Sequence, residues 1–437
     1  MKNTLFFGTC GRVVRGCGAL FFAFLLFSCA TKPFDKIDRE VLVGKYGEAE
    51  AVLEAEKEAL YDDDAILYYL DKGLLAHYAG NYGESSELLQ NGERAIEEAF
   101  TKSVTENIAS FIVNDKSKQY AGEDYEDLYL NVFNALNYHH QKKSEDAMVE
   151  IRRLGTKLQT LRSKYDVIEA GLTGEDAGAA EYADVEINFS NSALARYLGL
   201  LFYRAAGKSD DARIDRDWLK KAFVDEKPIY PFSTPSSVDE ELAVPRDKAR
   251  LNVIAFSGLS PVKVEEVIRI PLPPNNWIKI ALPEMVRRPS EVGKIELVFE
   301  DGAPKTLELL EDIQNVALET FKLHLGMIKA KSVIRGTAKG AVATGLSAAG
   351  QANDNGWLAL AGLAAQAFAE VSESADLRLS RYFPGKAYVG GVTLPPGTYT
   401  FFVNYYDANG GLIESIEQKD VVVQASELNL VETYCLK

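Results

Sequence analysis

Residues 66–90 read ILYYLDKGLLAHYAGNYGESSELLQ and decide the fold of the N-terminal half. Their apolar side chains recur at three- and four-residue spacing, which is the pattern of amphipathic helices. Gly80 and Tyr82 mark a turn near the middle. No proline occurs between Pro33 and Pro228, so the strongest helix breaker is missing from that long stretch. The sequence therefore predicts an all-α region over residues 37–225.

Residues 66–92 resemble a tetratricopeptide (TPR) repeat, in which small residues let two antiparallel helices approach closely. The residues at the matching offsets are Gly73, Gly80, Tyr82, Ser85, Leu89 and Gly92. Similar matches start at Leu128 and Ala193, which places the starts 62 and 65 residues apart. Residues 96–119 and 157–184 should then hold a divergent helix pair or a long connecting helix. The resemblance implies a TPR-like α-solenoid, with an irregular helical bundle as the alternative.

Overlaying the three repeats predicts a concave groove. The side chains expected to line it are Leu67, Leu70, Leu74, His77, Tyr129, Val132, Leu136, His139, Leu194, Tyr197, Leu201 and Arg204. Its floor would be apolar and aromatic, with a hydrogen-bond donor or a positive charge from each repeat at the lip. Such a groove suits an amphipathic helix or an extended peptide. The alternative is that these side chains pack against the neighbouring helix.

The N-terminus resembles a bacterial lipoprotein signal peptide over residues 1–28. Basic residues precede a short apolar run at positions 19–27, which is shorter than the ~20 residues of a spanning helix. The segment Leu26-Phe27-Ser28-Cys29 resembles a lipobox, which implies acylation of Cys29 and cleavage before it. An ordinary secretory signal or a membrane-anchored start is the alternative. Residues 29–36 would be a tether.

The residue after the cysteine, Ala30, implies the periplasmic face of the outer membrane. An inner-membrane or surface-exposed lipoprotein is the alternative. Lys and Arg total 48 against 64 Asp and Glu, a formal charge of −16 that argues against nucleic-acid binding. Removing the signal, which holds three of the positive charges, gives −16 − 3 = −19.

Few residues of this chain suggest catalysis or metal binding. The mature chain would keep only Cys29 and Cys435, so no internal disulfide is expected. His139 and His140 are neighbours on a predicted helix, and their side chains would point ~100° apart. No HExxH, CxxC or phosphate-loop pattern occurs. We expect no cofactor, no metal and no enzymatic activity, with a paired-carboxylate hydrolase as the alternative.

The composition changes after residue 225. Residues 226–248 are rich in proline and serine and are predicted to be a linker. Strand-like segments then occupy residues 251–256, 262–270, 277–282, 294–299, 387–394, 397–406, 413–424 and 428–434. Residues 394–401, LPPGTYTF, resemble a strand start of transthyretin-like and other immunoglobulin-like sandwiches. The segments 249–305 and 377–437 are therefore expected to form one two-sheet domain, with four strands from each.

A helical insert is predicted over residues 306–376, starting with an amphipathic helix from Leu307. Gly336, Gly340 and Gly345 are spaced as in a glycine zipper, which lets two helices of a hairpin pack closely. Lysine and arginine residues in its first arm make a packed or partner-contacting hairpin more favourable than a membrane-embedded one.

Together these features predict an α+β multidomain protein, with a TPR-like α-solenoid followed by a β-sandwich split by the helical hairpin. The layout resembles uncharacterised bacterial TPR-containing outer-membrane lipoproteins. The resemblance implies a membrane-anchored, non-enzymatic scaffold that binds an envelope protein through the groove, in cell-wall or outer-membrane assembly. Two alternatives are a self-assembling or pore-associated lipoprotein using the hairpin, and a peptidoglycan- or carbohydrate-binding sandwich. Partner identity and oligomeric state do not follow from the sequence.

Overall fold

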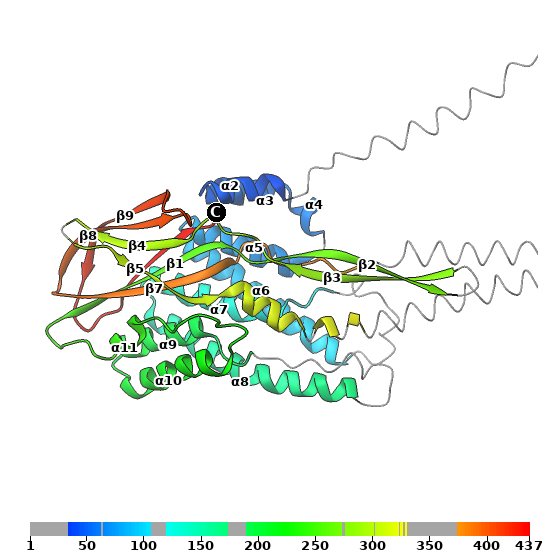
Figure 1. The fold of residues 1–437 in the computed structure, drawn as a ribbon, viewed down its shortest axis with the longest axis horizontal. Coiled ribbons are helices and arrows are strands. Elements are labelled where there is room, and N and C mark those ends of the chain that lie inside the picture. The colour runs from blue at the N-terminus through cyan, green and yellow to red at the C-terminus, as the bar shows by residue number, and fades with distance from the viewer. Residues whose placement is uncertain are drawn as a thin grey trace, which may run out of the picture.

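The computed structural model combines helices with several sheets (Figure 1), so the prediction of an α+β protein is confirmed. The structure describes residues 34–62, 64–105, 119–173, 189–272, 276–300, 302–322, 324–326, 328–329 and 374–437. Cys29, Gly336, Gly340 and Gly345 lie outside these residues.

The N-terminal half consists of helices. They are α2 (Asp35–Leu42), α3 (Tyr46–Ala55), α4 (Lys57–Tyr61), α5 (Ala65–Tyr78), α6 (Tyr82–Thr105), α7 (Asp124–His140), α8 (Ser144–Thr173), α9 (Ala193–Ala205), α10 (Ser209–Asp225) and the short α11 (Ser237–Glu240). The predicted intervals 96–119 and 157–184 begin as continuations of α6 and α8, which span 24 and 30 residues. The rest of each interval, residues 106–118 and 174–184, lies outside the described residues.

Four helix pairs are joined by turns of the same geometry: α2/α3, α5/α6, α7/α8 and α9/α10. After α5, Gly80 has a φ of 81°, its N–H donates to His77 O (3.0 Å), and the next N–H donates to Ala76 O (2.8 Å). This is a Schellman turn. The same bonds and a positive φ recur around Gly44, Lys142 and Gly207. His77, His139 and Arg204 therefore occupy equivalent positions, and α2/α3 is an additional pair that the sequence did not suggest.

Small residues permit close packing within the α5/α6 pair, as predicted. A Cβ atom on Gly73 would lie 2.9 Å from Leu89 Cδ2, and one on Gly92 would lie 3.3 Å from Leu70 Cδ2. Ser85 Oγ donates a hydrogen bond to Gly73 O (2.7 Å) across the pair. The two helices therefore fit together through the residues that carried the TPR resemblance.

Residues 226–248 pack into the interior, so the prediction of a linker there is wrong. Ile229, Tyr230 and Val238 are fully buried in the same core as the helices. The prolines of this segment break regular structure, but the apolar side chains between them fill space beside α9 and α10.

The C-terminal half holds ten strands in the described residues. They are β1 (Ala249–Leu259), β2 (Val262–Leu272), β3 (Asn276–Val286), β4 (Lys294–Phe299), β5 (Lys305–Thr306), β6 (Glu308–Asp312), β7 (Pro384–Leu394), β8 (Gly397–Tyr406), β9 (Leu412–Val423) and β10 (Asn429–Cys435). All eight predicted strands are confirmed within a few residues. One four-stranded sheet has the order β10-β1-β7-β6 and the other β5-β4-β8-β9. Among the described strands, the β1–β10 pairing is parallel and all others are antiparallel.

Two details of the predicted two-sheet domain are wrong. Within the described ranges, strands β2 and β3 pair only with each other and form a separate hairpin that extends away from both larger sheets (Figure 1). The helix predicted from Leu307 begins at residue 313, because β6 pairs with β7 over residues 308–312. The apolar spacing of this stretch fits a helix, but its backbone completes the edge of the sheet.

The β10-β1-β7-β6 sheet is covered on both faces. Val253 on β1 faces Leu297 and Val403 in the core between the two sheets. Ile254 and Phe256, on the opposite face of β1, belong to the core that includes the helices. Strands buried on both faces carry continuous apolar runs, as β1 does. The body thus has three layers: helix pairs, one sheet and a second sheet.

No helix in the described ranges is long and apolar enough to cross a membrane.

Candidate functional site

The side chains predicted to line a concave groove lie against the protein's own β10-β1-β7-β6 sheet. Those that are completely buried are Leu70, Leu74, His77, Tyr129, Val132, Leu136, Leu194, Tyr197 and Leu201, while Leu67 is 7% exposed and His139 and Arg204 are partly buried. The expectation of an open groove is therefore wrong. We call this set the inner face of the helices. At three places, polar side chains of the inner face bond to polar side chains of the sheet.

The first of these contacts joins α5 and α7 to β10. Glu432 Oε1 lies 2.9 Å from His77 Nε2, and Glu432 Oε2 lies 2.9 Å from His140 Nε2. His77 Nδ1 lies 2.7 Å from Asn137 Oδ1, so both nitrogens of this buried ring face oxygen atoms. The Tyr82 ring stacks on His140 with centroids 4.1 Å apart. One carboxylate thus connects two helices to the sheet.

Burial and charge act in opposite directions on Glu432. Burial alone would raise the pKa of its carboxyl group. The charge on His77 and hydrogen bonds from both histidines outweigh burial and hold the pKa at about 2. Glu432 is therefore ionised at neutral pH and acts as a buried acceptor.

The second contact joins α7 and α9 to β6 through Glu311. Its carboxylate accepts hydrogen bonds from Tyr129 Oη, from Ser192 Oγ (2.9 Å) and from the backbone N–H of Leu194. Tyr230 Oη lies 3.4 Å away. The carboxylate thus sits at the N-terminus of α9, where free N–H groups favour negative charge. Burial nevertheless raises the pKa of Glu311 to about 7.

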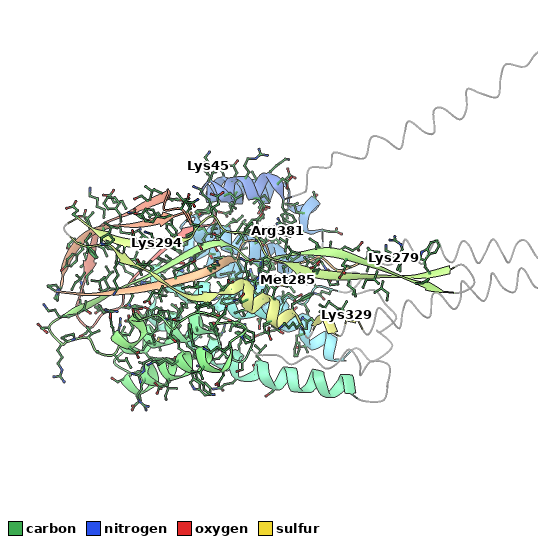
Figure 2. All side chains as sticks on the ribbon, viewed as in Figure 1. Lys45, Lys279, Met285, Lys294, Lys329 and Arg381 are labelled. Carbon is green, nitrogen blue, oxygen red and sulfur yellow. The ribbon has the colours of Figure 1, made fainter. Side chains whose placement is uncertain are left out.

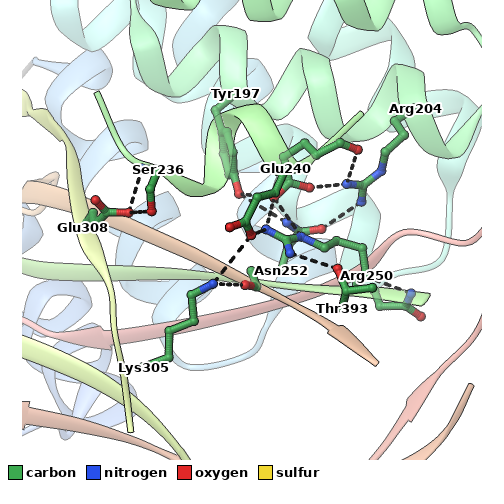
Figure 3. Close-up of polar contacts among 12 residues, drawn as sticks. Tyr197, Arg204, Ser236, Glu240, Arg250, Asn252, Lys305, Glu308 and Thr393 are labelled. Atoms are coloured by element: carbon green, nitrogen blue, oxygen red, sulfur yellow. Dashed lines mark hydrogen bonds and ion pairs between the residues drawn. The ribbon is translucent and has the colours of Figure 1, made fainter. Parts of the chain in front are cut away.

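The third contact joins α9 to β1 (Figure 3). Asn252 Nδ2 donates to Tyr197 Oη (3.2 Å), and Arg204 Nη2 donates to Asn252 Oδ1 (2.8 Å). Arg204 also pairs with the buried Glu241, which contacts Arg250 of β1 at 3.1 Å. The residues following α11 therefore complete this contact with a carboxylate.

His139 binds the sheet more weakly. Its Nε2 lies 3.3 Å from Leu430 O on β10, and burial lowers the pKa of its imidazole. In the described part of the chain, no group of three or more His, Cys, Asp or Glu residues could hold a metal ion. The adjacent His139 and His140 contact two different groups of β10, a carbonyl and a carboxylate.

Sequence reasoning missed the sheet's side of these contacts: Glu432, Glu311, Asn252 and Glu241. A signal was present for one of them. Residues 428, 430, 432 and 434 share one face of the predicted last strand, and Glu432 is a carboxylate among Leu and Tyr there. A charged side chain on an otherwise apolar strand face indicates a buried polar partner.

The β2–β3 hairpin is a second candidate site, and it exposes apolar side chains where the first site buries polar ones. Val264 and Ile268 are each 39% exposed, and Trp277 is 42% exposed. Lys279 lies toward the far end of this hairpin and Met285 lies near the body (Figure 2). Large apolar side chains are thus exposed along an element that extends away from the core.

Both candidate sites rest on the geometry of this chain. Comparison of the chain with protein-family models, curated proteins and solved structures finds no match.

Proposed function

We propose that this protein is a non-enzymatic scaffold of the cell envelope, anchored through lipid on Cys29, whose helices and sheets act as one rigid body. The observation that carries this proposal is the contact of the inner face with the sheet. Buried bonds from Glu432, Glu311 and Asn252 tie three helix pairs to one sheet. A body joined in this way can hold a projecting element at a fixed distance and angle.

The four equivalent Schellman turns support the TPR-like interpretation of the helices, because true repeats reproduce their turns. The shared core between the two four-stranded sheets supports the sandwich interpretation. The chain's own sheet, however, covers the predicted groove. In this proposal the partner therefore binds to the β2–β3 hairpin and not to the groove.

The anchor is tested by mass spectrometry of the native protein from envelope fractions. An N-terminal acylated Cys29 is expected, and Cys29→Ser should release the protein from the membrane fraction. Cys435→Ser is the matched control, because Cys435 is buried in β10 and should not affect anchoring. An unmodified N-terminus on a cytosolic protein would overturn the proposal.

Rigidity is tested by hydrogen–deuterium exchange of the same material. Backbone amides of α5, α7 and β10 should exchange together and slowly, because the buried bonds must break before any one of them opens. Rapid exchange of β10 beside protected helices would contradict a single rigid body.

A second candidate function is self-assembly. In the described residues β2 pairs only with β3, so the hairpin has two open edges, and open edges can pair with another chain. Photo-crosslinking from position 268 in the envelope would give links to a second copy in that case. The matched position is Ile214 on α10, which is 45% exposed on the body.

A further inference from the structure

The two strands of the β2–β3 hairpin differ in how far their side chains are exposed. On β3, Ile280, Ala281 and Leu282 are 2–4% exposed. On β2, Val264 and Val267 are 39% and 36% exposed. These two valines are three positions apart, so they lie on opposite faces of the strand. From position 264 outward, β2 is thus open to solvent on both faces, whereas the middle of β3 is covered.

The outer edge of β2 is regular and free of proline. β2 and β3 pair one to one over all 11 residues without a register shift. Pro261 and Pro271 enclose nine residues, positions 262–270, that include no proline. Each residue of this run therefore has a backbone N–H group, and in an antiparallel ladder alternate residues point these groups toward the outer edge. A strand added there would meet an uninterrupted row of donors and acceptors.

The other outer strands of the described sheets are protected against such pairing. β5 has two residues, and β6 and β9 contain register shifts. β10 is short and mostly buried. β3 carries Pro283, which has no N–H group. Natural proteins use short strands, bulges and proline to prevent edge-to-edge pairing, so the unprotected edge of β2 indicates that it has a partner.

The sequence of β2 determines how a second copy would pair with it. Two identical antiparallel strands in one sheet are related by a two-fold axis, which passes through a residue that lies opposite itself. An axis at Glu265 or Glu266 would place two equal negative charges opposite each other, which is unfavourable. An axis at Val267 places two valines there. Val267 is also the middle residue of β2, so this axis pairs the strand over its full length.

We propose that β2 pairs with β2 of a second copy of this chain, antiparallel and with Val267 on the two-fold axis. The two hairpins then form one continuous sheet in the order β3-β2-β2-β3. This inference rests on the proposed function, because it names a second copy as the partner of the projecting hairpin. The dimer carries two acylated Cys29 residues and therefore two membrane anchors.

The added strand accounts for the exposure and the stability of the hairpin. Val264 near the body and Ile268 farther out are both 39% exposed, so apolar exposure is even along β2. An even distribution fits pairing along the whole edge, whereas a contact at the end of the hairpin would require exposure concentrated there. A two-stranded hairpin is marginally stable by itself, and three or more strands make a sheet independently stable. The second copy supplies the missing strands.

Cysteine crosslinking in native envelopes tests the position of the axis. Val267→Cys should give a disulfide-linked dimer on mild oxidation, because the axis brings the two thiols side by side. Cys29 is acylated in the proposed protein and Cys435 is buried, so neither should compete. Val264→Cys is the matched control. Val264 is similarly exposed, but its two copies would lie six residues apart along the paired strands, about 20 Å, and should not link.

The outcomes of this experiment separate the inference from the proposed function. No dimer from Val267→Cys, or equal amounts from both variants, would overturn the inference. The membrane fraction of the same samples reports the anchor independently. Photo-crosslinks from position 267 to a different protein, without any to a second copy, would overturn the inference and leave the proposed function intact.

A charge exchange at Val267 tests the two-fold symmetry itself. Val267→Lys and Val267→Glu should each dimerise poorly, since each places two like charges on the axis. When the two variants are co-expressed with different tags, mixed dimers should be about tenfold more abundant than either same-charge dimer. Val264→Lys with Val264→Glu is the control and should show no such preference, because these positions do not meet. Circular dichroism of each variant checks its folding, and folded Val267 variants without a preference for mixed dimers would overturn the inference.

Discussion

The helix–sheet contact and the β2–β3 hairpin distribute polar and apolar side chains in opposite ways. In the contact, His77, Glu311 and Glu432 are buried and carry the bonds between layers. On the hairpin, Ile268 and Trp277 are more than a third exposed. Buried polar groups are costly unless they are bonded, and exposed apolar groups are costly unless they meet a partner.

The comparison shows which surface of this chain is available to other molecules. The inner face has the composition of a peptide-binding groove, but its polar side chains are already bonded to residues far along the chain. His77 and Glu432 are 355 positions apart. Lys263 at the base of the hairpin pairs with the buried Glu123, but none of the described hairpin side chains belongs to the core between the larger sheets. Substitutions in the inner face should therefore change the stability of the fold. Substitutions on the hairpin should change the association of the protein with other molecules.

Glu432→Gln should cause the largest loss of stability. The variant removes the charge between His77 and His140 while keeping the size of the side chain. Breaking a buried ion pair from one side costs about 3–5 kcal/mol, because the remaining charge stays buried. Urea unfolding followed by circular dichroism would measure this loss of unfolding free energy. Glu417→Gln on exposed β9 is the matched control, and an equal effect of the two variants would show that the buried contact does not hold the layers together.

Glu311 should give the body a stability that depends on pH. Burial raises its pKa from 4.5 to about 7, so the folded state holds this proton more tightly than the unfolded state. The resulting stabilisation is full below pH 4.5 and is lost as the pH rises through 7, by up to about 3 kcal/mol. The unfolding free energy of the wild type, relative to that of Glu311→Gln, should fall by up to about 3 kcal/mol as the pH rises through this range.

The pH dependence of Glu432 has the opposite sign. Its pKa is lowered to about 2, so its contribution is present above pH 4.5 and is lost only in acid. The difference between wild type and Glu432→Gln should therefore persist above pH 4.5 and shrink as the pH falls toward 2. A difference for Glu311→Gln that changes only in acid in the same way would contradict the raised pKa.

Local patterns in the sequence predicted most elements of this fold but not their partners. Alternation along β4 and β8 and the glycine at position 80 act over a few residues, so they could be read directly. The separate pairing of β2 with β3 and the closure of the inner face depend on contacts between distant segments. Residues 308–312 illustrate why local patterns are not sufficient. Their apolar spacing suits a helix, but they form a strand because they pair with β7.

Substitutions in two of the Schellman turns should change the free energy of unfolding by smaller amounts, one lowering it and the other raising it. A Cβ atom at Gly80 would have no atom within 4 Å, so Gly80→Ala is opposed only by its φ of 81° and should lose about 1 kcal/mol. Lys142 occupies the equivalent turn with a φ of 58°, and Lys142→Gly should gain up to about 1 kcal/mol. Thermal unfolding of both variants checks the sign. A loss from both would show that the two turns are not equivalent.

The smallest expected effect is that of Val264→Thr on the hairpin. Val264 is 39% exposed, and surface substitutions usually change stability by less than about 0.5 kcal/mol. The matched control is Val253→Thr in β1, where the same hydroxyl would enter a completely buried core and cost about 1–3 kcal/mol. Urea unfolding of both variants measures the difference. Equal losses would mean that the hairpin is part of the core of the body and that its exposed apolar side chains are not a free surface.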